Sequence, residues 1–214
     1  TKIKTMKVAI IGASGFIGSA ILNEALNRGH EITAIVRHPE KITVTNPHLT
    51  VKKGDATNEA ELIPLLAGNE AVISSYSAHD SATYVKAINA IINATKKAGI
   101  KRLIAVSGAG SLEIAPGVQL LDTPEFPAEW KEGASATRDA FYVIRQSADL
   151  DWTVLSPAMM IEPGERTGKF RLGTNQVVFN DKGESKISSA DYAVALLDEL
   201  EQPEHIKQRF TLAY

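Results

Sequence analysis

Residues 7–18 read KVAIIGASGFIG, an apolar run that breaks into three glycines, Gly12, Gly15 and Gly18, at three-residue spacing. This pattern predicts a buried strand, a tight turn and the start of a helix. Gly12 permits the sharp turn, Gly15 lets the backbone approach a pyrophosphate, and Gly18 permits close packing of helix on strand. Unpaired N–H groups at the helix start would face the phosphates. The stretch predicts a dinucleotide site, with a plain tight turn as the alternative. Its predicted contacts are Gly12, Ser14, Gly15, Phe16, Ile17 and Gly18.

Composition narrows the classes of protein to consider. The chain has 214 residues, of which 44% are hydrophobic and 22% charged, and its formal net charge is −2. This length suits one domain with a full core, and the balanced charge favours neither nucleic acid nor a membrane as partner. No apolar run approaches about 18 residues and the start does not resemble a signal peptide, so we expect a soluble, cytoplasmic protein. The absence of cysteine excludes disulfides and thiolate chemistry. Residues 1–5, before Met6, are expected to be a tag or a loose extension.

Short β-branched runs alternate with longer amphipathic stretches along the whole chain, which predicts repeated strand–helix–strand units around a parallel sheet. The stretches 111–127 and 162–175 lack periodicity and are predicted to be irregular covers of a pocket. We predict a single, doubly wound, mainly parallel Rossmann-type α/β domain over residues 1–214, with a small C-terminal substrate-pocket part at about 157–190. A monomer is favoured. Strands are expected at 7–11, 31–36, 49–53, 71–75, 103–107, 152–156 and 209–212, and helices at 16–28, 58–66, 81–98, 134–147 and 189–200.

The residue after the second expected strand indicates which dinucleotide binds. In this fold an acidic residue there binds the ribose hydroxyls of NAD. This chain instead has Arg37, followed by His38. A guanidinium pairs well with the 2′-phosphate of NADP, and Ser14 offers a further hydroxyl donor. The sequence therefore predicts NADP(H) in preference to NAD(H), with a solvated Arg37 as the alternative.

Hydroxyl side chains close the fourth and fifth expected strands. Ser74 and Ser75 end the fourth and Ser107 ends the fifth. Because ligands bind beyond the carboxyl ends of parallel strands, we expect all three near the cofactor. The histidines are scattered without ligand spacing, so no metal site is predicted and they are expected to be solvated. Asp191, Asp198 and Glu199 are expected on the wet side of the last helix.

The order of the motifs resembles that of atypical short-chain dehydrogenases/reductases, in the small NAD(P)H-binding branch of flavin and biliverdin reductase-like proteins and of bacterial proteins often labelled epimerases. The resemblance implies a nicotinamide cofactor and a role for Ser107 in polarising a substrate carbonyl. It implies that Asp55 contacts adenine, with a helix cap as the alternative, and it places Pro157 among the cofactor contacts. The matching motifs are GASGFIG (12–18), VR (36–37), GD (54–55), VSG (106–108), WTVLSP (152–157), PGERTG (163–168) and ISSADYA (187–193).

Conventional members of that superfamily use a Tyr-x-x-x-Lys pair, in which the lysine lowers the tyrosine pKa for proton transfer. No tyrosine of this chain has a lysine four residues later. Tyr142 lies on the corresponding expected helix, where packing is its alternative role. Arg166, in the second irregular stretch, is expected to bind an anionic acceptor. Ser107, Tyr142 and Arg166 are thus the candidate catalytic residues.

The missing pair shapes the functional hypothesis. A conjugated ring can accept hydride and take its proton from solvent, so the protein need only orient the two reactants and exclude water. We therefore expect an NADPH-dependent reductase of small flavin-like or quinone-like acceptors. One alternative is a non-catalytic NADP(H)-binding redox sensor. Another is an epimerase or dehydratase with a displaced acid/base group, such as Glu113 or Glu165.

Overall fold

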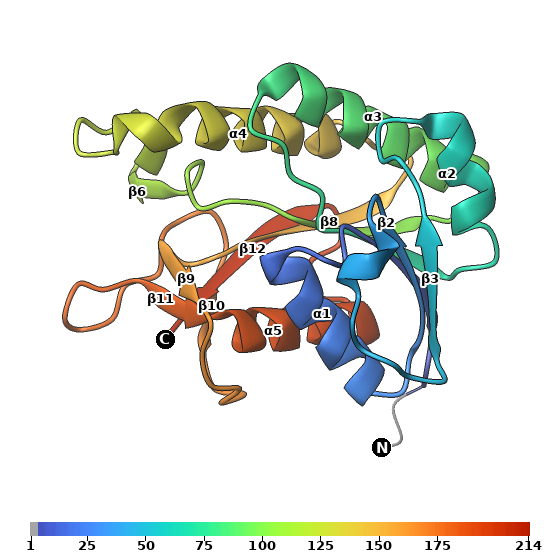
Figure 1. The fold of residues 1–214 in the computed structure, drawn as a ribbon. Helices are drawn as coiled ribbons and strands as arrows, with labels where there is room; N and C mark the ends of the chain where they lie inside the picture. Colours follow the sequence, from blue (N-terminus) through green and yellow to red (C-terminus); the bar gives the residue numbers. More distant parts are fainter. Residues whose placement is uncertain (1–3) are drawn as a thin grey trace.

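The computed structural model, drawn in Figure 1, describes residues 4–214; residues 1–3 of the expected N-terminal extension lie outside the described residues. Across the described part of the chain, one eight-stranded sheet has the order β10-β12-β8-β5-β4-β1-β2-β3. Neighbouring strands are parallel except β10, which runs antiparallel to β12. The strands of this sheet are β1 (Lys7–Ile11), β2 (Glu31–Val36), β3 (Leu49–Lys53), β4 (Ala71–Ser74), β5 (Arg102–Val106), β8 (Asp151–Ser156), β10 (Arg171–Gly173) and β12 (Gln208–Ala213).

Helices cover both faces of the sheet (Figure 1). α1 and α5 pack against each other on one face, while α2, α3 and α4 lie side by side on the other. Two further pairs of short strands lie outside the main sheet. The helices are α1 (Phe16–Asn27), α2 (Glu59–Leu66), α3 (Ser81–Lys97), α4 (Lys131–Arg145) and α5 (Ser189–Glu201), and the short strands are β6 (Glu113–Ala115) with β7 (Val118–Gln119) and β9 (Met160–Glu162) with β11 (Lys186–Ser188).

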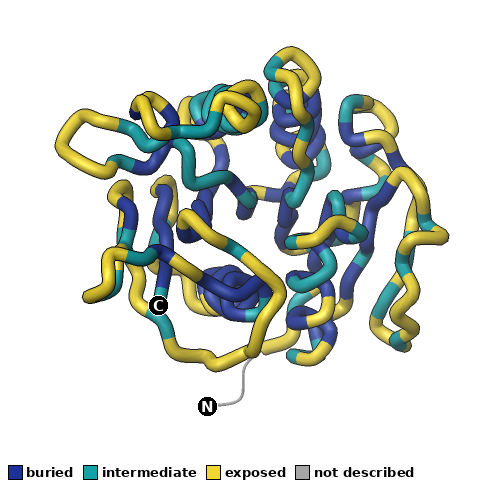
Figure 2. Tube along the Cα trace, turned by 60° about the vertical axis from the view of Figure 1, so that its left-hand side comes forward, coloured by how far each residue is buried: buried dark blue, intermediate teal, exposed yellow. Residues whose placement is uncertain are grey.

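The apolar run of β1 is continuous because both faces of the strand are buried. Val8 and Ile10 point into the core beneath α1 and α5, and Ala9 and Ile11 into the core beneath α2, α3 and α4. All four are at most 2% exposed. The sequence of a parallel strand that is buried on both faces does not alternate between apolar and polar residues. Figure 2 shows the buried residues along the sheet and the facing sides of the helices, with exposed residues in the outer loops.

Side-chain caps begin three of the helices. The Asn58 amide oxygen accepts from the Glu61 N–H at the start of α2, and the Asp80 carboxylate accepts from the Thr83 N–H at the start of α3. Ser188 does the same for the Asp191 N–H of α5. These polar caps satisfy N–H groups that a helix start leaves free. α1 differs, since Gly15 precedes it and no side chain among residues 4–214 caps it.

The strand order reverses beside β1. The chain runs from β1 to β2 and β3 on one side, and then returns to place β4 on the other side of β1. In an open α/β sheet, ligands bind at such a switch point, beyond the carboxyl ends of the two diverging strands. Gly12 follows β1 and Ser75 follows β4 at this point.

The expected doubly wound, mainly parallel α/β fold is confirmed, and each expected strand and helix is present. Two stretches expected to be irregular hold short strands. Residues 111–127 include the β6–β7 hairpin, whose turn needs the positive φ of Gly117, and residues 162–175 include β10. α4 begins at Lys131, three residues earlier than expected, because its first turn is polar and carries Gly133. None of the described helices has the length and apolar character needed to cross a membrane.

Candidate cofactor and acceptor site

Three cavities follow one another along the carboxyl edge of the sheet. The first, of about 490 Å³, lies over the β1–α1 turn and the end of β2. The second, of about 240 Å³, lies between the start of α1, the end of β5 and α3, and the third, of about 530 Å³, lies under residues 120–130 and α4. The first two share Gly15, Ser75, Tyr76 and Ser77, and the last two share Gly108 and Thr137. The shared walls make the three cavities one continuous groove.

The glycine turn forms the floor of the first two cavities. Gly12 has a φ of +79°, and a Cβ atom there would lie 2.7 Å from the Ser75 carbonyl oxygen. Gly15 has open space instead, since the one backbone atom near its Cβ position is 3.7 Å away. The uncapped N–H groups at the start of α1 lie beside this space. A glycine cradle next to a free helix N-terminus fits the pyrophosphate of a dinucleotide.

Basic side chains gather at the end of the first cavity. Arg37 and His38, which follow β2, line it together with Lys41 and Ser14. The first two and Ser14 were expected from the sequence, whereas Lys41 was missed. Lys41 could have been predicted from its position, because it follows Arg37 by four residues and a short helical turn at Pro39–Lys41 lies between them. The cluster matches the charge of a phosphate group.

The Asp55 carboxylate accepts hydrogen bonds from within its own loop. Its carboxylate accepts hydrogen bonds from the Thr57 N–H at 2.9 Å and the Thr57 hydroxyl at 2.8 Å. These bonds, with a smaller contribution from the charge of Arg37, lower the pKa of Asp55. The alternative of a helix cap is wrong, because Asn58 caps α2. Asp55 instead stabilises the turn whose neighbours Gly54 and Ala56 line the first cavity.

The second cavity is lined by several hydroxyl side chains, one of which is buried without a partner. Ser107 is 8% exposed, and its Oγ atom has no hydrogen-bond partner within residues 4–214. Tyr84 of α3 is 3% exposed and lines the same cavity, beside Tyr76, whose ring it meets edge to face at 5.7 Å between centroids. Burial raises the pKa of Tyr76 and that of Tyr84. Tyr84 was missed because its helical spacing indicates packing alone.

Apolar side chains dominate the third cavity. Phe126 and Trp130 meet edge to face at 6.4 Å between centroids, and Met159 and Met160 also contribute to the wall. Trp130 is 60% exposed, which is unusual for so large an apolar side chain and indicates a binding surface. The third cavity also contains Arg138, which already binds Asp122 at 3.0 Å.

A buried arginine fastens the loop over the third cavity. Arg209 of β12 donates to the Ser111 hydroxyl at 2.7 Å and to the Ser111 carbonyl at 3.2 Å. Its guanidinium also lies 4.6 Å from the centre of the Phe141 ring. Burial lowers the pKa of Arg209 to about 10, which leaves it charged at neutral pH. These contacts hold Ser111, a wall residue of the cavity, against the end of the sheet.

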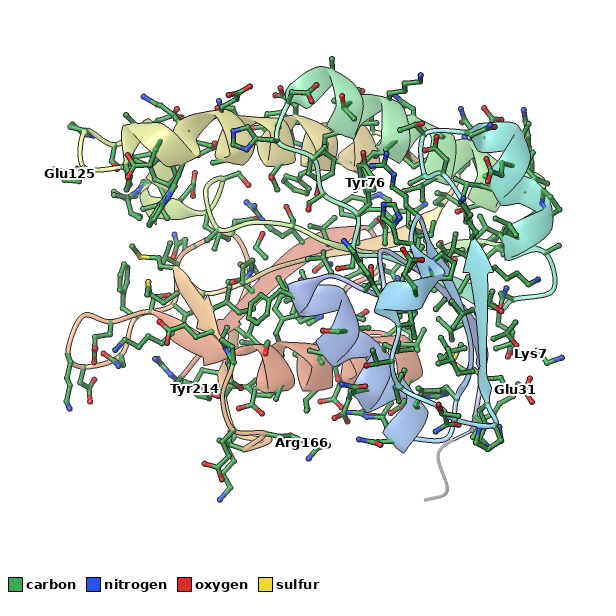
Figure 3. All side chains as sticks on the ribbon, in the orientation of Figure 1. Lys7, Glu31, Tyr76, Glu125, Arg166 and Tyr214 are labelled. Atoms are coloured by element: carbon green, nitrogen blue, oxygen red, sulfur yellow. The ribbon has the colours of Figure 1, made fainter. Side chains whose placement is uncertain are left out.

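The structure corrects the expectation for Arg166. Its guanidinium donates two hydrogen bonds to the Glu24 carboxylate of α1, at 2.8 and 3.0 Å. In Figure 3, Arg166 lies beyond α1, on the far side of the molecule from Tyr76 and Glu125. Arg166 belongs instead to a separate acidic hollow beside α5. The wall of the third cavity therefore includes Met159 and Met160 in place of the expected stretch 162–175.

Other expected site residues also lie apart from the groove walls. The Tyr142 hydroxyl accepts from the Gln119 amide at 3.0 Å, and its ring lies under Arg145, so its role in this structure is packing. Ser74 is buried at the end of β4, and the Pro157 carbonyl accepts from Thr211. Tyr142, Ser74 and Pro157 are not among the described residues that line the three cavities.

The two glutamates suggested as displaced acid/base groups lie away from the three cavities. Glu113 of β6 accepts a hydrogen bond from the Gly117 N–H within its hairpin. The carbonyl of Glu165 accepts from Ser188 on the β11 side of the molecule. Neither glutamate is among the described residues that line the three cavities.

One histidine and two acids expected in solvent are buried, and a second histidine is partly buried. His30 is fully buried and bonds Glu201 at 2.7 Å, and His205 stacks on Phe210 with ring centroids 4.2 Å apart. Glu199 is 4% exposed and binds Arg102. Asp191 is fully buried beneath the 162–175 stretch. Polar groups that are paired or hydrogen-bonded can lie in the core. Amphipathic spacing alone therefore gave a wrong prediction for the exposure of Asp191 and Glu199. Within residues 4–214, no group of three or more His, Cys, Asp or Glu side chains could hold a metal ion.

A family model described as NAD(P)H-binding matches residues 12–203. The chain belongs to this NAD(P)H-binding family. The match begins at Gly12, the first glycine of the cradle, and extends beyond the last residue of α5. The expected resemblance to the small NAD(P)H-binding branch is confirmed, and a nicotinamide dinucleotide is the cofactor of the fold.

Members of the family are similar to this chain over its full length. Protein YwnB of Bacillus subtilis, described as uncharacterized, is 42% identical over 212 residues, which cover 97% of this chain and 98% of YwnB. A structure from Bacteroides thetaiotaomicron, described as a candidate epimerase, is 46% identical with a TM-score of 0.94, covering 99% and 98% of the two chains. A structure from Streptococcus pneumoniae, described as a candidate NADH-flavin reductase, is 39% identical with a TM-score of 0.83, covering 97% and 99%. The chain thus has the nicotinamide-binding, oxidoreductase-like fold of its relatives.

Proposed function

We propose that this protein is an NADPH-dependent reductase of small, flat, conjugated acceptors. The observation that carries the proposal is the continuity of the groove. The second cavity adjoins the glycine cradle and shares Gly108 and Thr137 with the apolar third cavity. A dinucleotide lying over the cradle would bring its nicotinamide, which supplies hydride, to the second cavity. An acceptor in the third cavity would then be next to it.

The preference for NADPH rests on Arg37 and Lys41, the two cations of the first cavity. Arg37, His38 and Lys41 lie at the end of the groove where β2 stops, and Ser14 adds a hydroxyl. An additional phosphate on the adenosine ribose would gain charge-assisted hydrogen bonds from such a cluster. NADH lacks that phosphate and would leave the cations solvated. Arg37 is the residue that we expect to contribute most, because its guanidinium can bind a phosphate through two parallel bonds.

The acceptor class follows from the wall of the third cavity. Trp130, Phe126, Met159 and Met160 offer flat or adaptable apolar surface, which suits a planar ring system. Of its charged side chains, Glu125 and Glu129 are acidic, and the cation Arg138 is paired with Asp122. This balance favours a neutral acceptor over a phosphorylated one. The name of the Streptococcus pneumoniae relative supports the reductase class.

Calorimetric titration of the purified protein with NADPH and NADH tests the cofactor assignment. We expect NADPH to bind at least about tenfold more tightly, which corresponds to one charge-assisted contact. Oxidation of NADPH is then followed with menadione, as a neutral quinone, and with FMN, as an anionic flavin. Rates no higher than those of free NADPH with both acceptors would overturn the reductase assignment. Unequal affinities for NADPH and NADP⁺ in that case would favour the redox-sensor alternative.

A further inference from the structure

Ser107 and Tyr84 both carry a hydroxyl group and both line the second cavity. Ser107 follows β5, and Tyr84 lies in the first turn of α3, on a different element. Both side chains are more than nine-tenths buried, yet both line the cavity. Ser107 Oγ lacks a hydrogen-bond partner in the described chain. The Tyr84 ring packs edge to face against Tyr76, which lines the same cavity. A buried hydroxyl without a partner costs free energy, so the Ser107 hydroxyl is suited to bind a ligand in the cavity that Tyr84 also lines.

Ser107 and Tyr84 lie on the walls of one small cavity, of about 240 Å³. Ser107 is fixed at the carboxyl edge of the sheet, where its N–H donates to the Leu155 carbonyl at 3.0 Å. The same carbonyl accepts a hydrogen bond from the Tyr192 hydroxyl at 2.6 Å. Tyr84 lines the cavity from α3, so one small ligand group in the cavity can contact both residues.

We propose that Tyr84 is the catalytic proton donor of this protein and that, with Ser107, it binds the carbonyl oxygen of a neutral quinone or conjugated ketone. The inference rests on the proposed reductase function and deepens it by naming the substrate class and the acid. The tyrosine comes from α3, whereas Tyr142 of α4 is bonded to Gln119. The usual Tyr-x-x-x-Lys motif does not identify Tyr84, because Ile88 stands four residues after it.

The step balances with groups that the proposal names. As the acceptor takes a hydride from bound NADPH, the carbonyl π bond breaks and Tyr84 transfers its phenolic proton to the oxygen. The acceptor is reduced by two electrons and NADPH is oxidised to NADP⁺. The Tyr84 phenolate then takes a proton from water. Ser107 donates a hydrogen bond to the same oxygen while negative charge develops on it. Burial raises the pKa of Tyr84, which keeps the proton on the phenol before reaction.

Tyr84→Phe removes the hydroxyl alone and leaves the ring against Tyr76. With menadione and NADPH, we expect kcat/KM for menadione to fall about 100-fold, the usual contribution of a general acid, while NADPH affinity stays unchanged. Tyr142→Phe is the matched control, because its hydroxyl lies away from the groove, and it should retain the wild-type rate within about twofold. Ser107→Ala provides a second variant at the same oxygen, should Tyr84→Phe fold poorly.

A binding measurement on the cofactor-free protein separates this inference from the proposed function. Menadione binding is followed by quenching of Trp130 fluorescence, and 2-methylnaphthalene serves as the probe without carbonyls. Tyr84→Phe and Ser107→Ala should each weaken menadione by about fivefold, the value of one hydrogen bond, and leave 2-methylnaphthalene unchanged. Wild-type rates and wild-type menadione affinity in both variants would overturn the inference. Failure of the wild-type protein to oxidise NADPH would overturn the proposed function, while the binding comparison still decides the role of the hydroxyl pair.

Discussion

A Cβ atom on Gly18 would lie 2.0 Å from the carbonyl oxygen of Gly12, a distance at which the first turn of α1 must move away from β1. Gly18→Ala is therefore expected to destabilise the fold by about 3 kcal/mol or more, because the obstacle is backbone and cannot change rotamer. Chemical denaturation followed by circular dichroism measures this loss. An unfolding midpoint equal to that of the wild type would contradict the close packing of α1 on β1.

Gly15→Ala separates stability from binding in the same turn. The Cβ position at Gly15 is open and its φ of −75° suits alanine, so the free energy of unfolding should change by no more than about 1 kcal/mol. The added methyl would occupy the space next to the uncapped N–H groups of α1. We expect a loss of NADPH affinity of at least about tenfold by calorimetry. Retained affinity would place the pyrophosphate elsewhere.

Arg37→Glu should reverse the cofactor preference. The substitution replaces a cation of the first cavity with an acid that repels the 2′-phosphate and can bind ribose hydroxyls. We expect NADPH affinity to fall about 100-fold and NADH affinity to change little. Lys101→Glu makes the same change of charge at the exposed amino end of β5 and should leave both affinities unaltered. Equal losses of both cofactors in Arg37→Glu would show that Arg37 does not select between them.

Trp130→Ala tests the wall of the third cavity. Because Trp130 is 60% exposed, its truncation should leave the fold intact while it removes apolar contact from the acceptor. We expect KM for menadione to rise about tenfold with NADPH affinity unchanged. Phe179→Ala is the control, since Phe179 is 41% exposed and lies outside the groove. A similar rise in KM for both variants would point to a general loss of structure.

Arg166→Ala should affect stability and leave acceptor kinetics unchanged. The hydrogen bond from Arg166 is the largest influence on Glu24, whose pKa it lowers, with burial opposing and Arg28 assisting. Arg166 is half exposed, so we expect a loss of only about 1 kcal/mol at pH 7. The lowered pKa means that this stabilisation is present above the ordinary Glu value of 4.5 and disappears as pH falls through the folded value. Denaturation of both proteins between pH 7 and pH 3 should show the difference shrinking toward acid.

Asp191→Asn should destabilise the 162–175 stretch. The carboxylate accepts from the Thr167 and Gly168 N–H groups and from the hydroxyls of Thr167 and Tyr214. Burial by itself would raise the pKa of Asp191, but these hydrogen bonds outweigh it and lower the pKa. We expect a loss of about 2 kcal/mol at neutral pH. The stabilisation is fully present above the ordinary Asp value of 3.8, so the loss should shrink as pH falls through the lowered pKa of the folded protein. A difference in the free energy of unfolding that does not shrink toward acid would show that packing, and not the charge, is responsible.

Periodic patterns in the sequence were sufficient to predict the elements of the fold. The apolar run of β1, the glycines after it and the amphipathic spacing of α3 each reflect a local requirement of backbone geometry or burial. The short strands β6 and β10 were not predicted. β6 pairs with β7 across a turn that depends on Gly117, and β10 pairs with β12, which is distant in the sequence. Local pattern carries little information about such strands.

The lining of the first cavity was also predictable, since Ser14 and Arg37 are tied to the ends of predicted strands. The linings of the second and third cavities were not. Arg166 has the chemistry of an anion-binding residue, but Glu24 of α1 engages it. Tyr84 has the spacing of a packing residue, but α3 turns its ring into the second cavity. In both cases the partner comes from an element far away in the chain.

The sequence by itself determined the parallel sheet, the glycine cradle and the positive charge after β2, because these depend on residue type at fixed distances along one strand and its turn. Tertiary structure alone decided which polar groups face the groove. Strand order brings Ser107 and Tyr84 to one cavity, and helix packing removes Arg166 and Tyr142 from it. Side-chain partners are selected by proximity in space, and proximity between separate elements is a property of the packed fold.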